Sequence, residues 1–331
     1  MATNKAASIR QKLLNLSRER GESFDFVLQQ YAIQRLLYRL SVSEYHDQFL
    51  LKGAMLFSVW TGDLHRPTKD IDLLGFGSND IDVLVNDFKI ICATEADDGL
   101  IFDIESIQGV LIKEDSLYQG VRVTGFAHLE KAKIGLQVDI GFGDAVTPNA
   151  RLATIPSFLD SPAPIMKIYP VYTVIAEKFH AMVSLGLFNS RIKDFYDIWM
   201  IAIHGLQEGD CLLGGDTLDG TDFDGTALDG TDLDGTALDG TLLVSAIRST
   251  FNRRNTVMST EMLSVFTAEF MQDKNKHRQW NAFLNKNRIV SDQSFENIQQ
   301  GLRRFLEPAY QAAALGAEYP FKWDVSEGKW N

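Results

Sequence analysis

Asp70 and Asp72 are the pair of residues whose type and spacing could do chemistry. They alternate with the apolar Ile71 and Leu73, and residues two apart on a β-strand point to the same face. Both carboxylates would then project together, with Cα atoms about 6.6 Å apart at roughly 3.3 Å rise per residue. Two like charges at this distance repel unless a cation lies between them. Mg²⁺ suits this role, because it prefers oxygen ligands and is commonly shared with substrate phosphates.

A candidate phosphate-binding segment precedes this pair. Lys52, Gly53 and Ala54 come directly before the apolar run Met55–Trp60, which is typical of a helix. A turn of small residues that opens a helix offers backbone N–H groups and the positive end of the helix dipole to a phosphate. A phosphate site followed by two carboxylates is a plausible layout for nucleotide transfer. An Asp-x-Asp pair alone is a weak signal, however, because most such pairs are solvated turns or helix caps.

A third acid lies on a later predicted strand, Ala132–Phe142. Its apolar residues share one face, and these are Ile134, Leu136, Val138 and Ile140. Asp139 falls on the opposite face, with Gln137 and Gly135. Spacing alone leaves open whether Asp139 is an exposed edge residue or a functional one. Asp144, which follows the strand, is interpreted as a turn or cap residue.

Two predicted helices, Tyr172–Gly186 and Ser190–Ile203, carry a second charged group. Lys178 is a candidate to bind a triphosphate as a point charge. Asp194 is a candidate to fix the position of that lysine. The alternative is an ordinary salt bridge between two helices.

These segments together resemble the AbiEii/AbiGii-type nucleotidyltransferase toxins of type IV toxin–antitoxin systems, within the polymerase-β-like superfamily. The first family pattern is Lys-Gly-small-x-x-Leu followed by Arg-x-(Ser/Thr)-x-Asp-x-Asp, and here it comprises Lys52, Gly53, Ala54, Leu56, Arg66, Thr68, Asp70 and Asp72. The second is Ala-Glu-Lys followed by Arg-x-Lys-Asp-x-x-Asp, comprising Glu177, Lys178, Arg191, Lys193, Asp194 and Asp197. Ala54 stands where many relatives have Gly or Ser, and Leu56 is shifted by one position.

The resemblance implies a set of site residues. The catalytic residues would be Asp70, Asp72, Asp139, Lys178 and Asp194. Mg²⁺ would be bound by Asp70, Asp72 and Asp139, because the superfamily needs a third carboxylate on a neighbouring strand to hold two metal ions. The phosphates of an NTP substrate would contact Lys52, Gly53, Ala54, Arg66 and Lys178.

The implied function is that of an Mg²⁺-dependent nucleotidyltransferase (EC 2.7.7 type) and a toxin. It would transfer NMP from an NTP to an acceptor, either tRNA or protein, and would have a cognate antitoxin. Two alternatives stay open. One is a non-toxin nucleotidyltransferase that modifies a small molecule, and the other is a catalytically silent interaction protein that uses an internal repeat for docking.

The implied fold is α+β. A polymerase-β-like nucleotidyltransferase domain with a mixed sheet and flanking helices is expected over residues 1–165. A mainly helical domain is expected over 166–331, interrupted by an acidic insertion at 214–241.

Hydrophobic periodicity predicts the elements that must position these residues. The first part is predicted to contain helices Ala6–Arg20, Phe24–Leu40, 53–61 and Ile81–Ala93, and strands Phe49–Leu51, 70–74, Phe102–Ile107, Val110–Glu114, Val121–Leu129 and Ala132–Phe142. Arg35 and Arg39 are predicted on a solvated helix face. Five prolines between Pro148 and Pro170 predict an irregular connection. Four helices follow, Leu242–Asn255, Thr260–Gln272, Lys276–Leu284 and Phe295–Leu306, and the tail after Pro308 is expected to pack poorly unless its aromatic residues dock it.

Composition is that of a soluble globular protein, with 331 residues, 45% of them apolar. No run of about 18 apolar residues occurs, so no membrane association is expected. Only Cys92 and Cys211 are present, which indicates a reducing compartment and a cytoplasmic location. The net charge of −12 is uneven, because residues 208–240 carry ten acids and no base. The rest of the chain is near neutral and compatible with a nucleic-acid substrate.

The acidic segment contains a pentapeptide-like repeat. Asp-Gly-Thr recurs five times at a period of five residues, starting at Asp219, Asp224, Asp229, Asp234 and Asp239. Longer arrays of this kind form β-helices, but stacked repeats normally need several neighbours to bury a core. The repeat is interpreted as a flexible acidic insertion or a short ordered coil, and no active site is assigned to it.

Overall fold

The structure is a computed structural model that describes residues 2–61, 66–113, 119–205 and 237–331. The fold class is α+β, as the sequence predicts. The chain divides into two compact units. The first comprises 1–59, 63–145 and 152–169, and the second comprises 60–62, 146–151 and 170–331.

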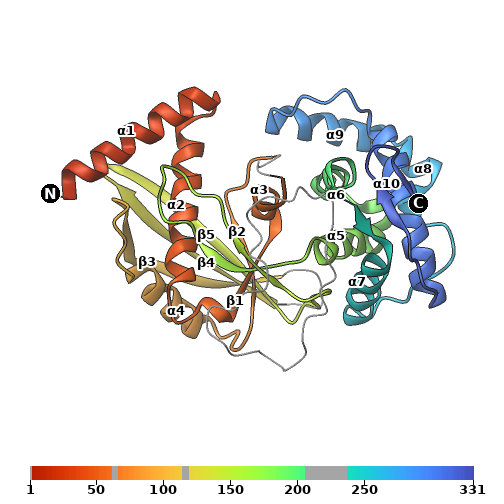
Figure 1. Cartoon of the computed structure of the whole chain (residues 1–331), viewed down its shortest axis with the longest axis horizontal. Helices are drawn as coiled ribbons and strands as arrows, with labels where there is room; N and C mark the ends of the chain where they lie inside the picture. The colour runs from red at the N-terminus through yellow and green to blue at the C-terminus, as the bar shows by residue number, and fades with distance from the viewer. Residues whose placement is uncertain (1, 62–65, 114–118, 206–236) are drawn as a thin grey trace. The chain divides into compact units, whose positions relative to one another are not determined.

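A seven-stranded mixed sheet forms the core of the first unit (Figure 1). Its strands are β1 (Phe49–Lys52), β2 (Ile71–Gly75), β3 (Ile101–Lys113), β4 (Gln119–Leu129), β5 (Ala132–Phe142), β6 (Arg151–Thr154) and β7 (Ile165–Ile168). The spatial order is β3-β4-β5-β2-β1-β7-β6. The pair β2–β5 is parallel, whereas β1–β2, β3–β4 and β4–β5 are antiparallel. This order places the two acid-bearing strands, β2 and β5, side by side at the centre of the sheet.

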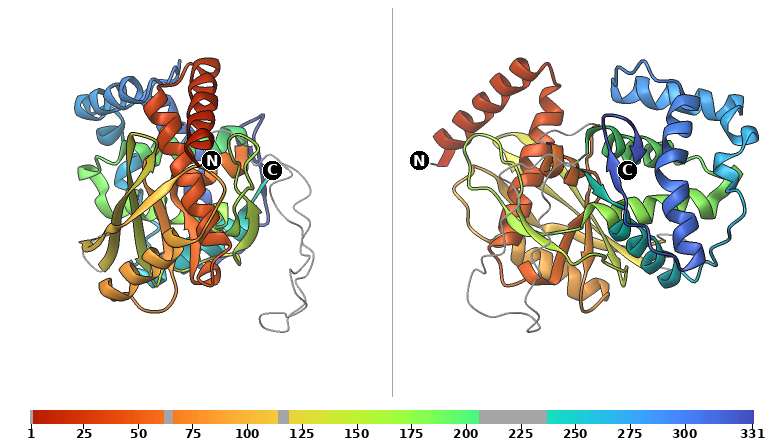
Figure 2. Two further views of the ribbon diagram at one scale, coloured as in Figure 1. Left: turned by 90° about the vertical axis from the view of Figure 1, so that its left-hand side faces the viewer. Right: turned by 45° about the vertical axis from the view of Figure 1, so that its right-hand side comes forward.

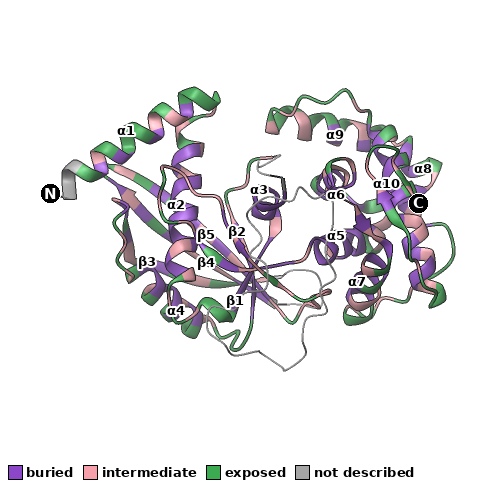
Figure 3. Cartoon of the chain, in the orientation of Figure 1, coloured by how far each residue is buried: buried purple, intermediate pink, exposed green. Residues whose placement is uncertain are grey.

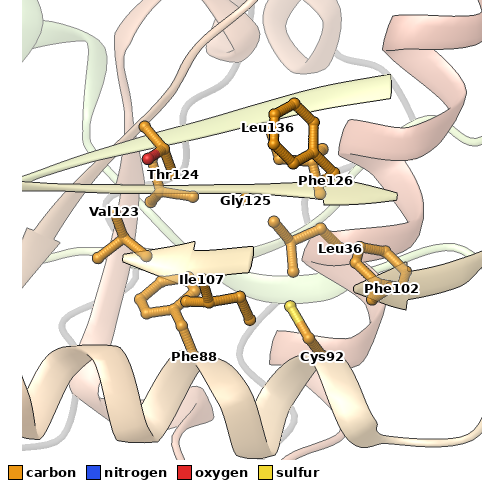
Figure 4. Close-up of a pocket in the computed structure, with 11 residues that line it drawn as sticks. Leu36, Phe88, Cys92, Phe102, Ile107, Val123, Thr124, Gly125, Phe126 and Leu136 are labelled. Carbon is orange, nitrogen blue, oxygen red and sulfur yellow. The ribbon is translucent and has the colours of Figure 1, made fainter. Parts of the chain in front are cut away.

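Helices α1 (Ala2–Arg20), α2 (Phe24–Ser41), α3 (Leu56–Thr61) and α4 (Ile81–Ala93) accompany the sheet. Ser23 caps α2 and Asp80 caps α4 through side-chain bonds to backbone N–H groups. Phe88 and Cys92 of α4 point toward the apolar face of the strands, where Leu36 of α2 also packs (Figure 4). Because this face is buried under helices, the polar face that carries Asp139 is left for a site. Burial raises the pKa of the Cys92 thiol to about 12, which argues against a nucleophilic role for this cysteine.

The second unit is mainly helical (Figures 1 and 2). Its helices are α5 (Val171–Leu185), α6 (Ile192–His204), α7 (Gly240–Arg253), α8 (Ala268–Met271), α9 (Lys274–Asn287) and α10 (Phe295–Leu315). Phe179 of α5 is central to the core, with ring contacts to Phe251, Phe266 and Tyr310. Figure 3 shows α5 largely buried. Residues Val171–Phe188 have the length and hydropathy of a membrane span, but 56% of this segment is buried inside the protein, as in a core helix.

Two predictions of local structure are wrong. Strands β6 and β7 form within the proline-rich segment 148–170, and β7 joins the sheet beside β1. The predicted strands Phe102–Ile107 and Val110–Glu114 are one irregular strand, β3, although Glu114 itself lies outside the described residues.

The tail beyond Pro308 is ordered, because α10 continues to Leu315 and is followed by β9 (Lys322–Asp324) and β10 (Lys329–Trp330). Trp323 is buried and Trp330 stacks on Phe305, so aromatic residues dock the tail, which is the alternative that the sequence left open.

The predicted insertion 214–241 lies outside the described residues up to position 236. Its last Asp-Gly-Thr unit, Asp239-Gly240-Thr241, is described. Leu238–Asp239 forms strand β8, which pairs with β9, and Asp239 caps α7 through the N–H of Leu242 at 3.0 Å. This part of the repeat therefore serves as a strand end and a helix cap.

Candidate functional site

One row of charged residues crosses four adjacent strands of the first unit. Lys52 on β1 pairs with Asp72 on β2, and Asp72 pairs with Asp139 on β5. Asp139 in turn pairs with Arg122 on β4. Residues paired directly across strands have side chains on the same face. The sheet register therefore brings two predicted metal ligands, Asp72 and Asp139, to one place with a cation on each outer side.

Gly53 lies directly against Asp72. Its φ of +78° is in the region that favours glycine, and a Cβ atom built there would be 2.0 Å from Asp72 Oδ2. No other residue fits this position without displacing the carboxylate. Ala54 follows in the buried 3₁₀ turn Gly53–Met55 that leads into α3. The predicted phosphate-binding turn and the predicted metal carboxylate are thus in immediate contact.

Arg122 binds Asp139 through two parallel bonds, from Nε to Oδ1 at 2.7 Å and from Nη2 to Oδ2 at 2.8 Å. The hydrogen bond to Asp139 raises the pKa of the Arg122 guanidinium, and the fields of Asp139, Asp70 and Asp72 raise it further. The charges of all three predicted metal ligands therefore act on one guanidinium. Sequence analysis missed Arg122. Counting back through the hairpin in which Leu129 pairs with Ala132 could have found it, because that register places residue 122 opposite 139.

Asp70 stands directly before β2 and is half-buried. The segment leading to it is tied to α2, because the Gln30 side chain donates to the Thr68 carbonyl at 2.6 Å. Arg66, predicted to bind phosphate, opens this described segment and is also half-buried. The charge of Asp70 also contributes to the raised pKa of Arg122.

Lys52 has a buried partner that the sequence did not predict. Its Nζ lies 3.1 Å from Oδ2 of Asp144, and the two side chains are only 9% and 8% exposed. The interpretation of Asp144 as a turn or cap residue is therefore wrong. Asp144 offsets the charge of a buried lysine and holds it at the edge of the charged row.

The carboxylate oxygens of the predicted ligands are the kind of donor that Mg²⁺ prefers. Asp72 and Asp139 present hard oxygen atoms from paired positions, and Asp70 adds a third carboxylate nearby. Within the described ranges, no three acid, histidine or cysteine side chains already converge as a metal-binding group. In this structure the Asp139 carboxylate is bonded to Arg122 through both of its oxygens. A metal ion bound by Asp139 would compete with these bonds or use the remaining lone pairs.

Lys178 is held in the second unit by two buried carboxylates. Its Nζ donates to Asp194 Oδ1 at 3.0 Å and to Asp197 Oδ2 at 2.8 Å. Arg191 Nε donates to the other oxygen of Asp194 at 2.6 Å. Asp194 is fully buried and bridges both cations. This contact fits the predicted role of fixing the lysine and equally the alternative of an ordinary salt bridge between two helices. Asp197 is a second partner of the same kind.

The chain was compared with known families, curated proteins and solved structures. A comparison with curated proteins found no match. Among solved structures, JHP933 from Helicobacter pylori is 12% identical, covers 89% of this chain and 94% of its own, and has a TM-score of 0.44. A nucleotidyltransferase candidate from H. pylori is also 12% identical, covers 89% of this chain and 96% of its own, and has a TM-score of 0.42. TM-scores this low do not establish a common fold. The family described as "Nucleotidyl transferase AbiEii toxin, Type IV TA system" matches residues 35–214, more than half of the chain. The chain belongs to the AbiEii nucleotidyltransferase toxin family.

Proposed function

We propose that this nucleotidyltransferase transfers NMP from an NTP to a macromolecular acceptor in an Mg²⁺-dependent reaction. The main support is the register that places Asp72 beside Asp139 on one sheet face, with Gly53 against the Asp72 carboxylate. Membership of a type IV toxin–antitoxin family implies a nucleotide substrate and an antitoxin partner in general. The metal, the individual site residues and the acceptor are the parts proposed here.

Each side chain has a role in the proposal. Asp70 and Asp72 would hold Mg²⁺, and Asp139 would complete the site and accept the proton of the acceptor hydroxyl. When bound, Mg²⁺ would neutralise phosphate charge and stabilise the attacking and leaving oxygens. The N–H groups of Gly53 and Ala54 would face the phosphates.

The remaining cations would serve the triphosphate. We assign Arg66, Lys52 and Lys178 to this role because of the family pattern that they match. Asp194 would keep the Lys178 ammonium in one position, which is supported by their 3.0 Å hydrogen bond. A preorganised cation stabilises developing charge without the cost of reorganisation during the reaction.

The reaction class is tested by incubating the protein with each radiolabelled NTP, Mg²⁺, total RNA and a cell protein extract. We expect a labelled macromolecule with the wild type and a decrease of at least about 100-fold with Asp72→Asn, because one metal ligand and one charge are lost. Asp82→Asn is the matched control, since Asp82 is an exposed aspartate of α4.

Equal labelling by wild type and Asp72→Asn would overturn the proposed site. Label found only in a small molecule would favour the alternative of a non-toxin enzyme. Expression without the antitoxin should arrest growth, and Asp72→Asn should relieve the arrest if toxicity depends on this reaction.

A further inference from the structure

Strand β3 is an edge strand, because it forms one end of the seven-stranded sheet (Figure 1). No strand of the described ranges pairs with its outer side, where backbone N–H and C=O groups remain available for another strand. The segment 107–112 of this strand contains no charged residue and no proline. Its Val110 and Leu111 are 52% and 56% exposed. An uncharged edge with exposed apolar side chains is a surface to which a further β-strand binds.

Only the first half of β3 is protected against such pairing. Sheets commonly protect their edges with charged residues, prolines or bulges. Asp103 and Glu105 supply charges in β3, and its register with β4 shifts between Asp103 and Gln108. From Gln108 onward the pairing is regular. The edge is therefore regular and unprotected over 107–112, which limits an added strand to this segment.

Both faces of the segment 107–112 carry an exposed apolar side chain. Ile107 lies beside Phe88 of α4 in Figure 4, so it faces the helical layer. Because side chains alternate along a strand, Leu111 shares that face and Val110 lies on the opposite one. An added strand would therefore remove apolar surface from water on both sides of the sheet.

Helix α4 lies directly over this edge strand. A Cβ atom built at Gly109 would be 2.6 Å from Cγ2 of Ile81 and 2.9 Å from Cγ2 of Val85. Residues four apart lie on the same side of a helix, so Lys89 continues the line from Ile81 and Val85. Asp82, next to Ile81, is exposed in the first turn. The side of α4 above the edge thus has an acid near its start and a base about two turns later.

We propose that residues 107–112 pair with the same residues of a second copy of this chain, in antiparallel order. The two sheets then form one continuous sheet about a two-fold axis. Such an interface uses the same surface on both copies, so the two backbones and the exposed apolar side chains match by symmetry. This inference concerns association and does not depend on the proposed function.

Charge favours a second copy over a foreign strand at this edge. The two-fold axis is perpendicular to the sheet, so both α4 helices lie on one face and run in opposite directions. Asp82 of one copy then faces Lys89 of the other, and the same contact occurs twice. A foreign strand would bring no helix to meet these two charges.

The proposed dimer leaves both charged rows accessible. Because the axis is perpendicular to the sheet, the polar faces of the two copies point the same way. Five strand spacings of about 4.8 Å separate Asp139 from its counterpart, which places the two rows roughly 24 Å apart. Variants that dissociate the dimer should therefore keep the transfer activity of each copy, so association and activity are tested separately.

Sedimentation velocity and light scattering between about 1 and 100 µM test the association. The wild type should approach twice the chain mass of 37.1 kDa as its concentration rises. Val110→Lys and Leu111→Lys should each raise the dissociation constant of the dimer at least about tenfold, because two ammonium groups meet near the axis. Val290→Lys is the matched control, since Val290 is fully exposed in the second unit, and it should keep the wild-type mass.

A charge exchange tests the arrangement of the two helices. Lys89→Glu should weaken the dimer, because Asp82 would then meet a carboxylate, and the added change Asp82→Lys should restore it. Amide hydrogen exchange locates the contact. In the wild type the amides of 107–112 should exchange more slowly at the highest than at the lowest concentration, and in Val110→Lys they should exchange equally at both.

A wild type that keeps the mass of one chain over this range would overturn the inference. So would a dimer that both lysine substitutions in β3 leave intact, or one whose concentration-dependent protection lies outside 107–112. If a substitution in β3 prevents folding, seen as a missing thermal transition, the charge exchange on α4 decides instead, because both of its positions reach solvent. Failure of the double variant to restore the dimer then rejects the proposed arrangement.

Discussion

At the scale of single residues, the site combines acids that the sequence predicts with counter-ions that it does not. Asp72 and Asp139 stand out because a carboxylate on an otherwise apolar strand is conspicuous in a local window. Arg122 and Asp144, by contrast, do not stand out among the residues that surround them in the sequence. Their roles follow from pairing across strands, which depends on distant parts of the chain.

Arg122→Gln is expected to make the protein depend on Mg²⁺ for part of its stability. Asp139 would then lie beside Asp72 without its partner, so the unfolding temperature without metal should fall. The effect should be about 1 kcal/mol or less, because Arg122 is 37% exposed. Added Mg²⁺ should restore the loss, and half-maximal transfer should need less Mg²⁺, since the ion no longer competes with a guanidinium. Thermal unfolding with and without Mg²⁺ and a metal titration of activity measure both effects.

Arg10→Gln is the control for this prediction, because Arg10 lies 3.8 Å from Glu130 in an exposed ion pair. A higher Mg²⁺ requirement in Arg122→Gln would contradict the competition between ion and guanidinium.

His180 predicts a pH dependence of stability. Burial and the nearby Arg254 charge lower its pKa to about 4 from an ordinary value of 6.5. Nη1 of Arg254 lies 3.2 Å from Nδ1, which fits a neutral ring that accepts there and donates from Nε2 to Thr256 at 2.7 Å. The unfolded chain takes up a proton below about pH 6.5 and the folded protein does so only near pH 4. His180 therefore contributes stability that is complete above pH 6.5 and is lost as the pH falls toward 4.

Denaturant unfolding at several pH values between 7 and 4 measures the predicted loss of stability. His180→Gln should flatten the decline over that window, whereas His46→Gln, which removes an exposed imidazole, should leave it as in the wild type. An equally steep decline in His180→Gln would show that other groups cause it.

At the scale of elements, α2 shows why a correct helix does not reveal its contacts. The helix is predicted correctly, but Arg35 and Arg39 are buried rather than solvated. Arg35 Nε lies 3.0 Å from Asp98 Oδ2, and Arg39 binds both oxygens of the same carboxylate. Helical periodicity assigns charged residues to the solvent. No pattern in the sequence indicates that Asp98, in the loop after α4, contacts Arg35 and Arg39.

Asp98→Asn should be strongly destabilising, because it leaves two buried guanidiniums without their counter-ion. Loss of one partner from a buried ion pair costs about 3–5 kcal/mol. Its neighbour is a matched control, since Asp97 is exposed and, among the ion pairs of the described residues, contacts only Lys5, which is also exposed. Asp97→Asn should change stability by less than about 0.5 kcal/mol in chemical denaturation. Similar losses in both variants would contradict a structural role specific to Asp98.

Helix α10 is a second case in which packing overrides a local signal. A proline inside a helix removes a hydrogen bond and is expected to end or kink it. Here Pro308 lies among buried Phe305, Leu306, Ala309 and Tyr310. Trp330 stacks on Phe305 at 5.5 Å between ring centroids and donates to its carbonyl at 3.0 Å. Tertiary contacts of this kind stabilise the helix and the tail together.

At the scale of the whole molecule, the sequence predicts the fold class and most elements because their periodicities are local. The order of the strands in the sheet, in contrast, cannot be predicted from local periodicity. Strand β7 comes from a proline-rich segment, and only Leu51 and Ile168 are register partners in its pairing with β1. A pairing so short and so distant leaves no pattern in either strand. The structure divides into two units. The boundary between two domains at residue 165 stays a prediction.

The row formed by Lys52, Asp72, Asp139 and Arg122 has no net formal charge. Many clusters of acids are self-repelling and become ordered only after an ion arrives. In this row Arg122 already pairs with Asp139, so part of the negative charge is offset before any ion binds. If the proposed Mg²⁺ dependence is correct, the protein would therefore fold without the ion and start to work when magnesium and a nucleotide are supplied.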